Sequence, residues 1–166
     1  MSRILIVGAG FVGLSTARQL RNLVPHASVT LIDSKDRFVF TPRLIDAVED
    51  ADYPASSLHA DLRTMAKRDG FTFIQGTVTL IQREKRTLTY LPPTNQDQSV
   101  SLSYDILILS QGAKACFYNI PGAAEYAIPL KSEEDVHHLH DQVHALLEES
   151  AHLTSDEARK DKLSFI

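Results

Sequence analysis

The sequence predicts an α/β fold with a parallel sheet and an inserted three-stranded antiparallel meander. Three observations support this fold class: an apolar strand that runs into a glycine-rich turn, a helix and a second strand directly after it, and a later group of three short strands. The chain has 166 residues, of which 43% are hydrophobic. This is the size of one ordinary globular domain, with enough apolar residues to bury a core.

The first elements form a βαβ unit. Residues 4–7, Ile-Leu-Ile-Val, are a continuous apolar run, which is typical of a strand buried on both faces in a parallel sheet. From Phe11 to Val24 the apolar residues recur at helical spacing, and Pro25 ends the helix. Val29 to Ile32 is apolar and rich in β-branched residues, so it predicts a second strand that closes on Asp33.

The middle of the chain predicts shorter elements. Residues 38–54 contain Pro42 and Pro54, with acidic residues that include Asp50 and Asp52, and they predict a loop with one helical turn. A helix is expected from Ser57 to Arg68, followed by a strand from Phe71 to Ile74. Three short antiparallel strands should come next, over 77–82, 86–91 and 100–104, with a polar turn at 92–98.

The last third predicts one more strand and a helix. Ile106 to Leu109 reads as a second deeply buried strand that runs into a loop at Ser110. Ser132 is followed by three acidic residues, which predicts an N-cap and the first turn of a helix that reaches about Ser150. Residues 148–162 form a polar, helix-prone linker of the kind that joins domains, and residues 162–166 read as the start of a further strand.

Composition excludes several classes of function. The net charge of −4 provides no basic surface, so no nucleic-acid partner is expected. A single cysteine, Cys116, rules out an internal disulfide and a Cys-x-x-Cys pair, which favours a cytoplasmic protein. No apolar run approaches the roughly 20 residues of a membrane span, so no transmembrane segment is expected here.

Three histidines, His137, His140 and His144, follow one edge of the last predicted helix. The spacing between the second and third would suit a metal ion, but no cysteine or acidic third ligand is evident. We therefore expect a partly exposed helix edge and no metal site.

The strongest motif is Gly8-Ala9-Gly10-Phe11-Val12-Gly13, which matches GxGxxG between a strand and a helix. In this pattern Gly8 allows the sharp turn, Gly10 lets the backbone approach a pyrophosphate, and Gly13 lets the helix pack closely on the sheet. The phosphates then lie on free N–H groups at the helix N-terminus. The motif predicts a Rossmann-like FAD/NAD(P)-binding fold.

Asp33 lies at the end of the second predicted strand, where a carboxylate can accept hydrogen bonds from ribose hydroxyls. Its charge would repel a 2′-phosphate, which favours FAD or NAD over NADP. The alternative is a solvated acid at a strand end.

Five segments resemble type II NADH dehydrogenases, the NADH:quinone oxidoreductases. Arg37 to Pro42 resembles the segment that runs toward the flavin ring, and Phe73 to Val78 resembles the strand whose backbone meets the adenine. Ser103 to Gly112 resembles the second flavoprotein motif, in which Ser110-Gln111-Gly112 replaces the usual Ala-Thr-Gly. Residues 120–122 and 129–132 continue the resemblance, whereas Arg43 stands where an aliphatic residue is more usual.

The resemblance covers the whole chain but only about the first third of a family member. It implies a flavoprotein that passes electrons from NADH through FAD to a quinone, peripheral on the cytoplasmic face of the membrane. It also implies the first part of an FAD-binding domain over 1–131, a connecting helix and linker over 132–161, and the start of a truncated NAD(P)H-binding domain over 162–166. As such a fragment, the chain should be inactive alone and prone to self-association.

The resemblance and the motifs together give a set of cofactor-binding residues, and none of them is expected to be catalytic because hydride transfer is the chemistry of the cofactor. The set is Gly8, Gly10, Phe11, Val12, Gly13, Asp33, Ser34, Lys35, Thr41, Pro42, Val78, Ser110 and Gly112.

Two other functions remain open. One is a sulfide:quinone or ferredoxin-type flavoprotein reductase. The other is a non-catalytic NAD-binding module, against which the inserted meander argues. A second GxGxxG and a Gly-Asp flavin motif beyond Ile166 would separate them.

Overall fold

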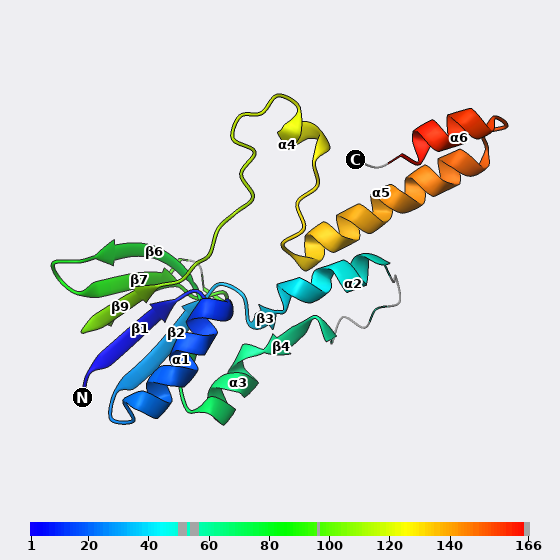
Figure 1. Ribbon diagram of the computed structural model, residues 1–166. Coiled ribbons are helices and arrows are strands. Elements are labelled where there is room, and N and C mark those ends of the chain that lie inside the picture. The colour runs from blue at the N-terminus through cyan, green and yellow to red at the C-terminus, as the bar shows by residue number, and fades with distance from the viewer. Residues whose placement is uncertain (50–52, 54–56, 96, 165–166) are drawn as a thin grey trace. The chain divides into compact units, whose positions relative to one another are not determined.

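The computed structural model describes residues 1–49, 53, 57–95 and 97–164 (Figure 1). Its contacts divide the chain into two compact units. Unit 1 comprises Met1–Val39 and His59–Lys114, and unit 2 comprises Phe40–Leu58 and Ala115–Ile166. Several predicted features lie outside the described residues, namely Asp50, Asp52, Pro54, Gln96 in the meander turn, and Phe165–Ile166 of the last predicted strand.

Unit 1 is built on a four-stranded parallel sheet, as predicted. Its strands are β1 (Arg3–Val7), β2 (Ser28–Asp33), β5 (Thr72–Gln75) and β9 (Ile106–Leu109). The spatial order is β5-β2-β1-β9. The first strand, β1, is therefore an inner strand that pairs with β2 on one side and with β9 on the other. This 3-2-1-4 order is that of a doubly wound dinucleotide-binding sheet.

The central strand β1 is buried on both faces, which confirms its predicted environment. Ile4 and Ile6 pack in one apolar cluster with residues of the helices α1 (Phe11–Leu23) and α3 (Leu62–Asp69). Leu5 and Val7 pack in a second cluster that contains residues of the meander. Because strand side chains alternate, one short apolar run supplies both layers.

The predicted meander is confirmed. It consists of β6 (Thr77–Gln82), β7 (Thr87–Leu91) and β8 (Val100–Ser103), all antiparallel. Leu88 of β7 is fully buried, and Tyr104 directly after β8 is 5% exposed. These side chains attach the meander to the parallel sheet.

The helix predicted from Ser57 begins too early. His59–Asp61 is instead a strand, β4, which pairs antiparallel with β3 (Arg37–Val39). The helix α3 starts only after Asp61, whose carboxylate accepts a hydrogen bond of 2.6 Å from the Thr64 N–H. Such an N-cap fixes the helix start, and a three-residue strand is too short to show a period in the sequence.

The prediction that the 106–109 strand is deeply buried is wrong. Ile106 is 50% exposed and Leu109 is 54% exposed. In the described part of the chain β9 pairs with β1 on one side and with no strand on the other. An apolar run therefore predicted the strand correctly but not its position at the edge of the sheet.

Unit 2 is more helical than predicted. Residues 38–54 contain the 3-10 helix η1 (Thr41–Arg43) and the helix α2 (Leu44–Glu49), where one helical turn was expected. Farther along lie the short α4 (Ala123–Tyr126), α5 (Glu133–Ala151) and α6 (Asp156–Lys162).

The capped helix predicted after Ser132 is confirmed. The Ser132 hydroxyl accepts from the Asp135 N–H at 3.2 Å, and the Asp135 carboxylate accepts from the Ser132 N–H at 2.8 Å. By contrast, the prediction that a strand begins at Lys162 is wrong at that residue, because Lys162 is the last residue of the helix α6. The predicted domain boundaries at 131 and 161 stay predictions.

An ion-pair cluster in unit 1 predicts a pH-dependent stability. Asp69 pairs with Arg68 and with Arg18 of α1, and the Arg68 hydrogen bond, followed by that of Arg18, lowers the pKa of Asp69 to about 2. Since folding favours the ionised form, the stabilisation is present above about pH 4 and is lost as the pH falls toward 2. We expect Asp69→Asn to lower the free energy of unfolding by about 1 kcal/mol at pH 7.

Urea unfolding at pH 7 and near pH 2 measures this effect, with the exposed Asp97→Asn as the matched control. The Asp69→Asn difference should be much smaller at the lower pH, where Asp69 is largely protonated in the unfolded chain and about half protonated in the folded one. A difference that is equal at both pH values would show that the ion pairs do not cause it.

Candidate functional site

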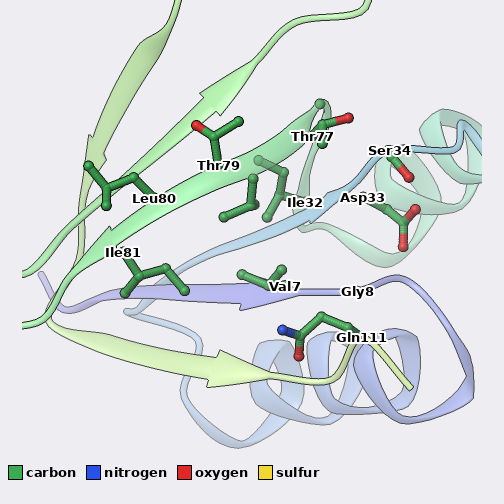
Figure 2. A pocket seen from close by; sticks show the side chains of 12 residues that line it. Val7, Gly8, Ile32, Asp33, Ser34, Thr77, Thr79, Leu80, Ile81 and Gln111 are labelled. Carbon is green, nitrogen blue, oxygen red and sulfur yellow. The ribbon is translucent and has the colours of Figure 1, made fainter. Parts of the chain in front are cut away.

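Three strands of the parallel sheet end side by side at a cavity in unit 1. Gly8 follows β1, Asp33 ends β2, and Gln111 lies two residues after β9 (Figure 2). The carboxyl ends of such strands are where doubly wound folds bind ligands. The cavity has a volume of about 440 Å³ and is lined by Val7, Gly8, Ile32, Asp33, Ser34, Gly76, Thr77, Val78, Thr79, Leu80, Ile81 and Gln111.

The glycine-rich turn has the geometry that its motif predicts. Gly8 has a φ of +100°, and a Cβ placed there would lie 2.4 Å from the carbonyl oxygen of Ser110. A Cβ on Gly13 would lie 1.8 Å from the carbonyl oxygen of Gly8, so the helix packs directly on the turn. A Cβ on Gly10 would meet nothing within 4 Å. The first and third glycines are thus required by the fold, and the second faces open space.

The N-terminus of α1 suits an anion. Its cap, Gly10, has no side chain to bind the first N–H groups, and its first turn contains no acidic residue. Phe11 and Val12 are 43% and 67% exposed, and the Phe11 ring lies edge-on to Phe38 with 5.0 Å between centroids. The N–H groups that begin a helix and the helix dipole favour negative charge at this point.

Asp33 is held by the backbone around it. One carboxylate oxygen accepts from the Ala9 N–H at 2.6 Å and the other from the Lys35 N–H at 2.9 Å. Its carbonyl oxygen accepts from the Gly76 N–H at 2.8 Å. These hydrogen bonds fix the position of the carboxylate, and its contact with a ribose stays a prediction. Because each carboxylate oxygen has two acceptor sites, the group retains capacity for ribose hydroxyls.

The loop after β9 is tied to the same turn. The Ser110 hydroxyl lies 2.9 Å from the carbonyl oxygens of both Val7 and Gly8 and donates its single proton to them. Gly112 has a φ of +75°, which glycine adopts readily. The serine that replaces the usual alanine of Ala-Thr-Gly thus uses its hydroxyl to hold the loop after β9 against the glycine turn.

On the meander side, Thr77, Val78 and Thr79 of β6 line the cavity. Gly76 precedes them, and a Cβ there would lie 2.3 Å from the Tyr90 ring. A second hollow of about 260 Å³ continues from Ser34, Gly76 and Thr77.

Four of the predicted cofactor residues of unit 1, namely Gly8, Asp33, Ser34 and Val78, line the cavity. The other residues of the glycine turn follow Gly8 in the chain, Lys35 follows Ser34, and Ser110 and Gly112 flank the lining residue Gln111. Thr41 and Pro42 lie in η1 of unit 2, and their contact with a flavin stays a prediction.

Sequence reasoning missed Thr77, Thr79 and Gln111 as lining residues. The two threonines alternate along a predicted strand, so one face of that strand could have been proposed. Gln111 was noticed only as a departure from a motif.

The lining residues fit the ADP half of a dinucleotide. The cavity offers Gly8 of the glycine turn, which leads into the N-terminus of α1, for phosphates, a carboxylate for ribose, and the β6 residue Val78 for adenine.

The histidines of α5 have other contacts within unit 2. His140 Nε2 lies 2.9 Å from the carbonyl oxygen of Ala47, and its ring stacks on that of His144 with 5.8 Å between centroids. Among the residues that the structure describes, no group of three or more His, Cys, Asp or Glu could hold a metal ion. Within the same residues, no helix has the length and hydropathy of a membrane span.

Comparison with known proteins matches residues 2–153 to the family described as pyridine nucleotide-disulphide oxidoreductase. The chain is 28% identical over 167 residues to the external alternative NAD(P)H-ubiquinone oxidoreductase B4, mitochondrial, of Arabidopsis thaliana, covering 95% of this chain and 28% of the relative. It is 29% identical over 143 residues to the type II NADH:quinone oxidoreductase of Haemophilus influenzae, covering 81% of this chain and 32% of the relative.

Among solved structures, NDH2 of Plasmodium falciparum in complex with NADH is similar, with a TM-score of 0.76 and 25% identity. The match covers 96% of this chain and 32% of that chain. The chain thus spans about a third of the length of these relatives.

Proposed function

The chain belongs to the pyridine nucleotide-disulphide oxidoreductase family, and from this membership we propose that it forms the FAD-binding part of a type II NADH:quinone oxidoreductase. The relatives named for NADH or NAD(P)H and for a quinone or ubiquinone support this assignment over most of the chain. In the proposed enzyme NADH is the electron donor and a quinone is the acceptor.

The observation that carries the proposal is the cavity where Gly8, Asp33 and Val78 meet. The residues of the turn and of α1 bind the diphosphate, Asp33 binds the adenosine ribose, and the Val78 main chain lies against adenine. FAD, when bound, supplies the hydride-accepting chemistry. The residues of this chain hold and orient it, and none acts as an acid, base or nucleophile.

The remaining assignments complete the proposal. Ser34 and Lys35 border the ribose, Ser110 and Gly112 support the turn, and Thr41 and Pro42 extend toward the flavin. We also propose that the whole protein is cytoplasmic and peripheral on the membrane.

Asp33 supports FAD over NADP-type ligands. Its carboxylate accepts two backbone N–H groups and lies at the cavity wall. A 2′-phosphate placed beside it would meet like charge, whereas FAD carries a free 2′-hydroxyl on its adenosine ribose.

The test is ligand selectivity of the 166-residue chain with and without Asp33. Wild type should bind ADP at least about tenfold more tightly than 2′-phospho-ADP, because the carboxylate repels the added phosphate. In Asp33→Ala this preference should disappear, while affinity for ADP and FAD falls. Calorimetric titration of each ligand measures the ratio.

The ratio of the two affinities, for ADP and for 2′-phospho-ADP, distinguishes loss of ribose recognition from damage to the loop around Asp33. Loss of the two backbone hydrogen bonds lowers the affinity for both ligands alike and leaves the ratio unchanged. An unchanged ratio in Asp33→Ala would contradict the ribose assignment, and absence of ADP and FAD binding in wild type would contradict the proposed function.

A further inference from the structure

The sheet order places Gln111 and Asp33 on opposite sides of the glycine turn. Asp33 ends β2, the turn follows β1, and Gln111 follows β9, in the spatial order β2-β1-β9. A dinucleotide laid across these strand ends has its ribose at β2 and its diphosphate at β1. The next position, at β9, is that of the phosphate farther from adenosine.

The Gln111 side chain lies in the cavity with Gly8 and Val7 (Figure 2). Its backbone is fixed on one side by Ser110, whose N–H donates to the Val7 carbonyl at 2.7 Å, and it is followed by Gly112. No hydrogen bond of its carboxamide to another described residue is found. The amide is therefore positioned at the site with both of its N–H donors available.

The charge of the cavity makes neutral donors important. Asp33 is the charged side chain among the described lining residues, and no lysine or arginine is among them. A diphosphate bound here relies on N–H groups, because no cation of the wall neutralises it. The amide of Gln111 adds such a donor, and a carboxylate in its place would add repulsion.

We propose that the Gln111 carboxamide binds the β-phosphate of the ADP half and so helps determine the affinity of the cavity for diphosphate ligands. This inference rests on the proposed function, because it assumes that the cavity holds the ADP half of FAD. It concerns a residue that departs from the motif which this chain resembles.

The experiment titrates ADP and AMP into the 166-residue chain and its variants by calorimetry. Gln111→Ala should weaken ADP about fivefold, the value of one hydrogen bond of about 1 kcal/mol. Gln111→Glu should weaken ADP about tenfold further through like charge. AMP lacks the β-phosphate, so Gln111→Ala should change its affinity less than about twofold. FAD should follow ADP.

The matched controls are Gln142→Ala and Gln142→Glu, which make the same changes on an exposed residue of α5 that does not line the cavity. They should leave ADP binding unchanged, and thermal unfolding should show that all variants remain folded.

Each outcome has a separate meaning. If wild type binds neither ADP nor FAD, the proposed function fails and this inference falls with it. If wild type binds ADP but Gln111→Ala binds it equally well or more tightly, the inference fails while the proposed function stands. Equal losses for ADP and AMP, or equal effects at Gln142, would also overturn the β-phosphate assignment.

Discussion

Gly13→Ala is expected to unfold most of unit 1. The added Cβ would lie 1.8 Å from the Gly8 carbonyl oxygen and 2.7 Å from the Ser110 hydroxyl oxygen. The first of these atoms is main chain in a turn that is itself hydrogen-bonded to β2, so it cannot rotate away. Overpacking of this kind costs about 3 kcal/mol or more, a large part of the roughly 5–15 kcal/mol that stabilises a domain.

Urea unfolding followed by circular dichroism measures this loss. We expect the urea midpoint of Gly13→Ala to fall so far that little of the native signal of wild type remains even without urea. Native-like stability of this variant would show that α1 does not pack on the glycine turn as closely as the structure has it.

Gly10→Ala is the matched variant, because the same methyl group at Gly10 meets no atom within 4 Å. Its φ of −72° suits alanine, so the free energy of unfolding should stay the same or rise by about 0.5 kcal/mol. Binding of ADP should nevertheless weaken at least about tenfold, since the methyl group occupies the approach of the diphosphate. Unchanged ADP affinity would mean that the ligand does not pass over Gly10.

The sequence predicted the parts of the fold that depend on local pattern. The apolar run of β1, the helical spacing after Phe11 and the cap at Ser132 each correspond to an element of the structure. The glycine motif also predicted the turn correctly, because its first and third positions are constrained by backbone contacts that no other residue type allows.

Other features depend on neighbours distant in sequence. The exposure of β9 follows from its place at the sheet edge, and the pairing of β3 with β4 joins two three-residue segments that have no period of their own. Gln111 lines the cavity because β9 pairs with β1. The sequences of residues 3–7 and 106–109 each predict a strand, but they do not show that the two strands pair. Spacing alone could not predict these contacts.

The second large effect concerns flavin content, and we expect the 166-residue chain to purify colourless. The cavity offers groups for phosphate, ribose and adenine, and none of its described lining residues is aromatic or cationic. A flavin ring would therefore gain little burial from this cavity, whereas tight cofactor sites bury about 70–90% of their ligand. FAD and ADP should bind within about threefold of each other, because the ADP half provides most of the contacts.

The same chain should self-associate through β9. Ile106 and Leu109 are half exposed on a strand that is paired on one side in the described structure, and such an edge is a template for another strand. Ile106→Lys should shift the mass measured by light scattering toward the monomer. Leu23→Lys, a change of the same kind at the exposed end of α1, should not.

Absorbance at the flavin bands and light scattering on one preparation test both expectations together. A colourless, associating chain whose Ile106→Lys variant is monomeric would support both expectations, and the ADP titrations described above then show whether the ADP half of the site is formed. A yellow monomer with one FAD per chain would contradict both expectations. The flavin would then be enclosed by residues of this chain, for which Thr41 and Pro42 of η1 are the first candidates to replace.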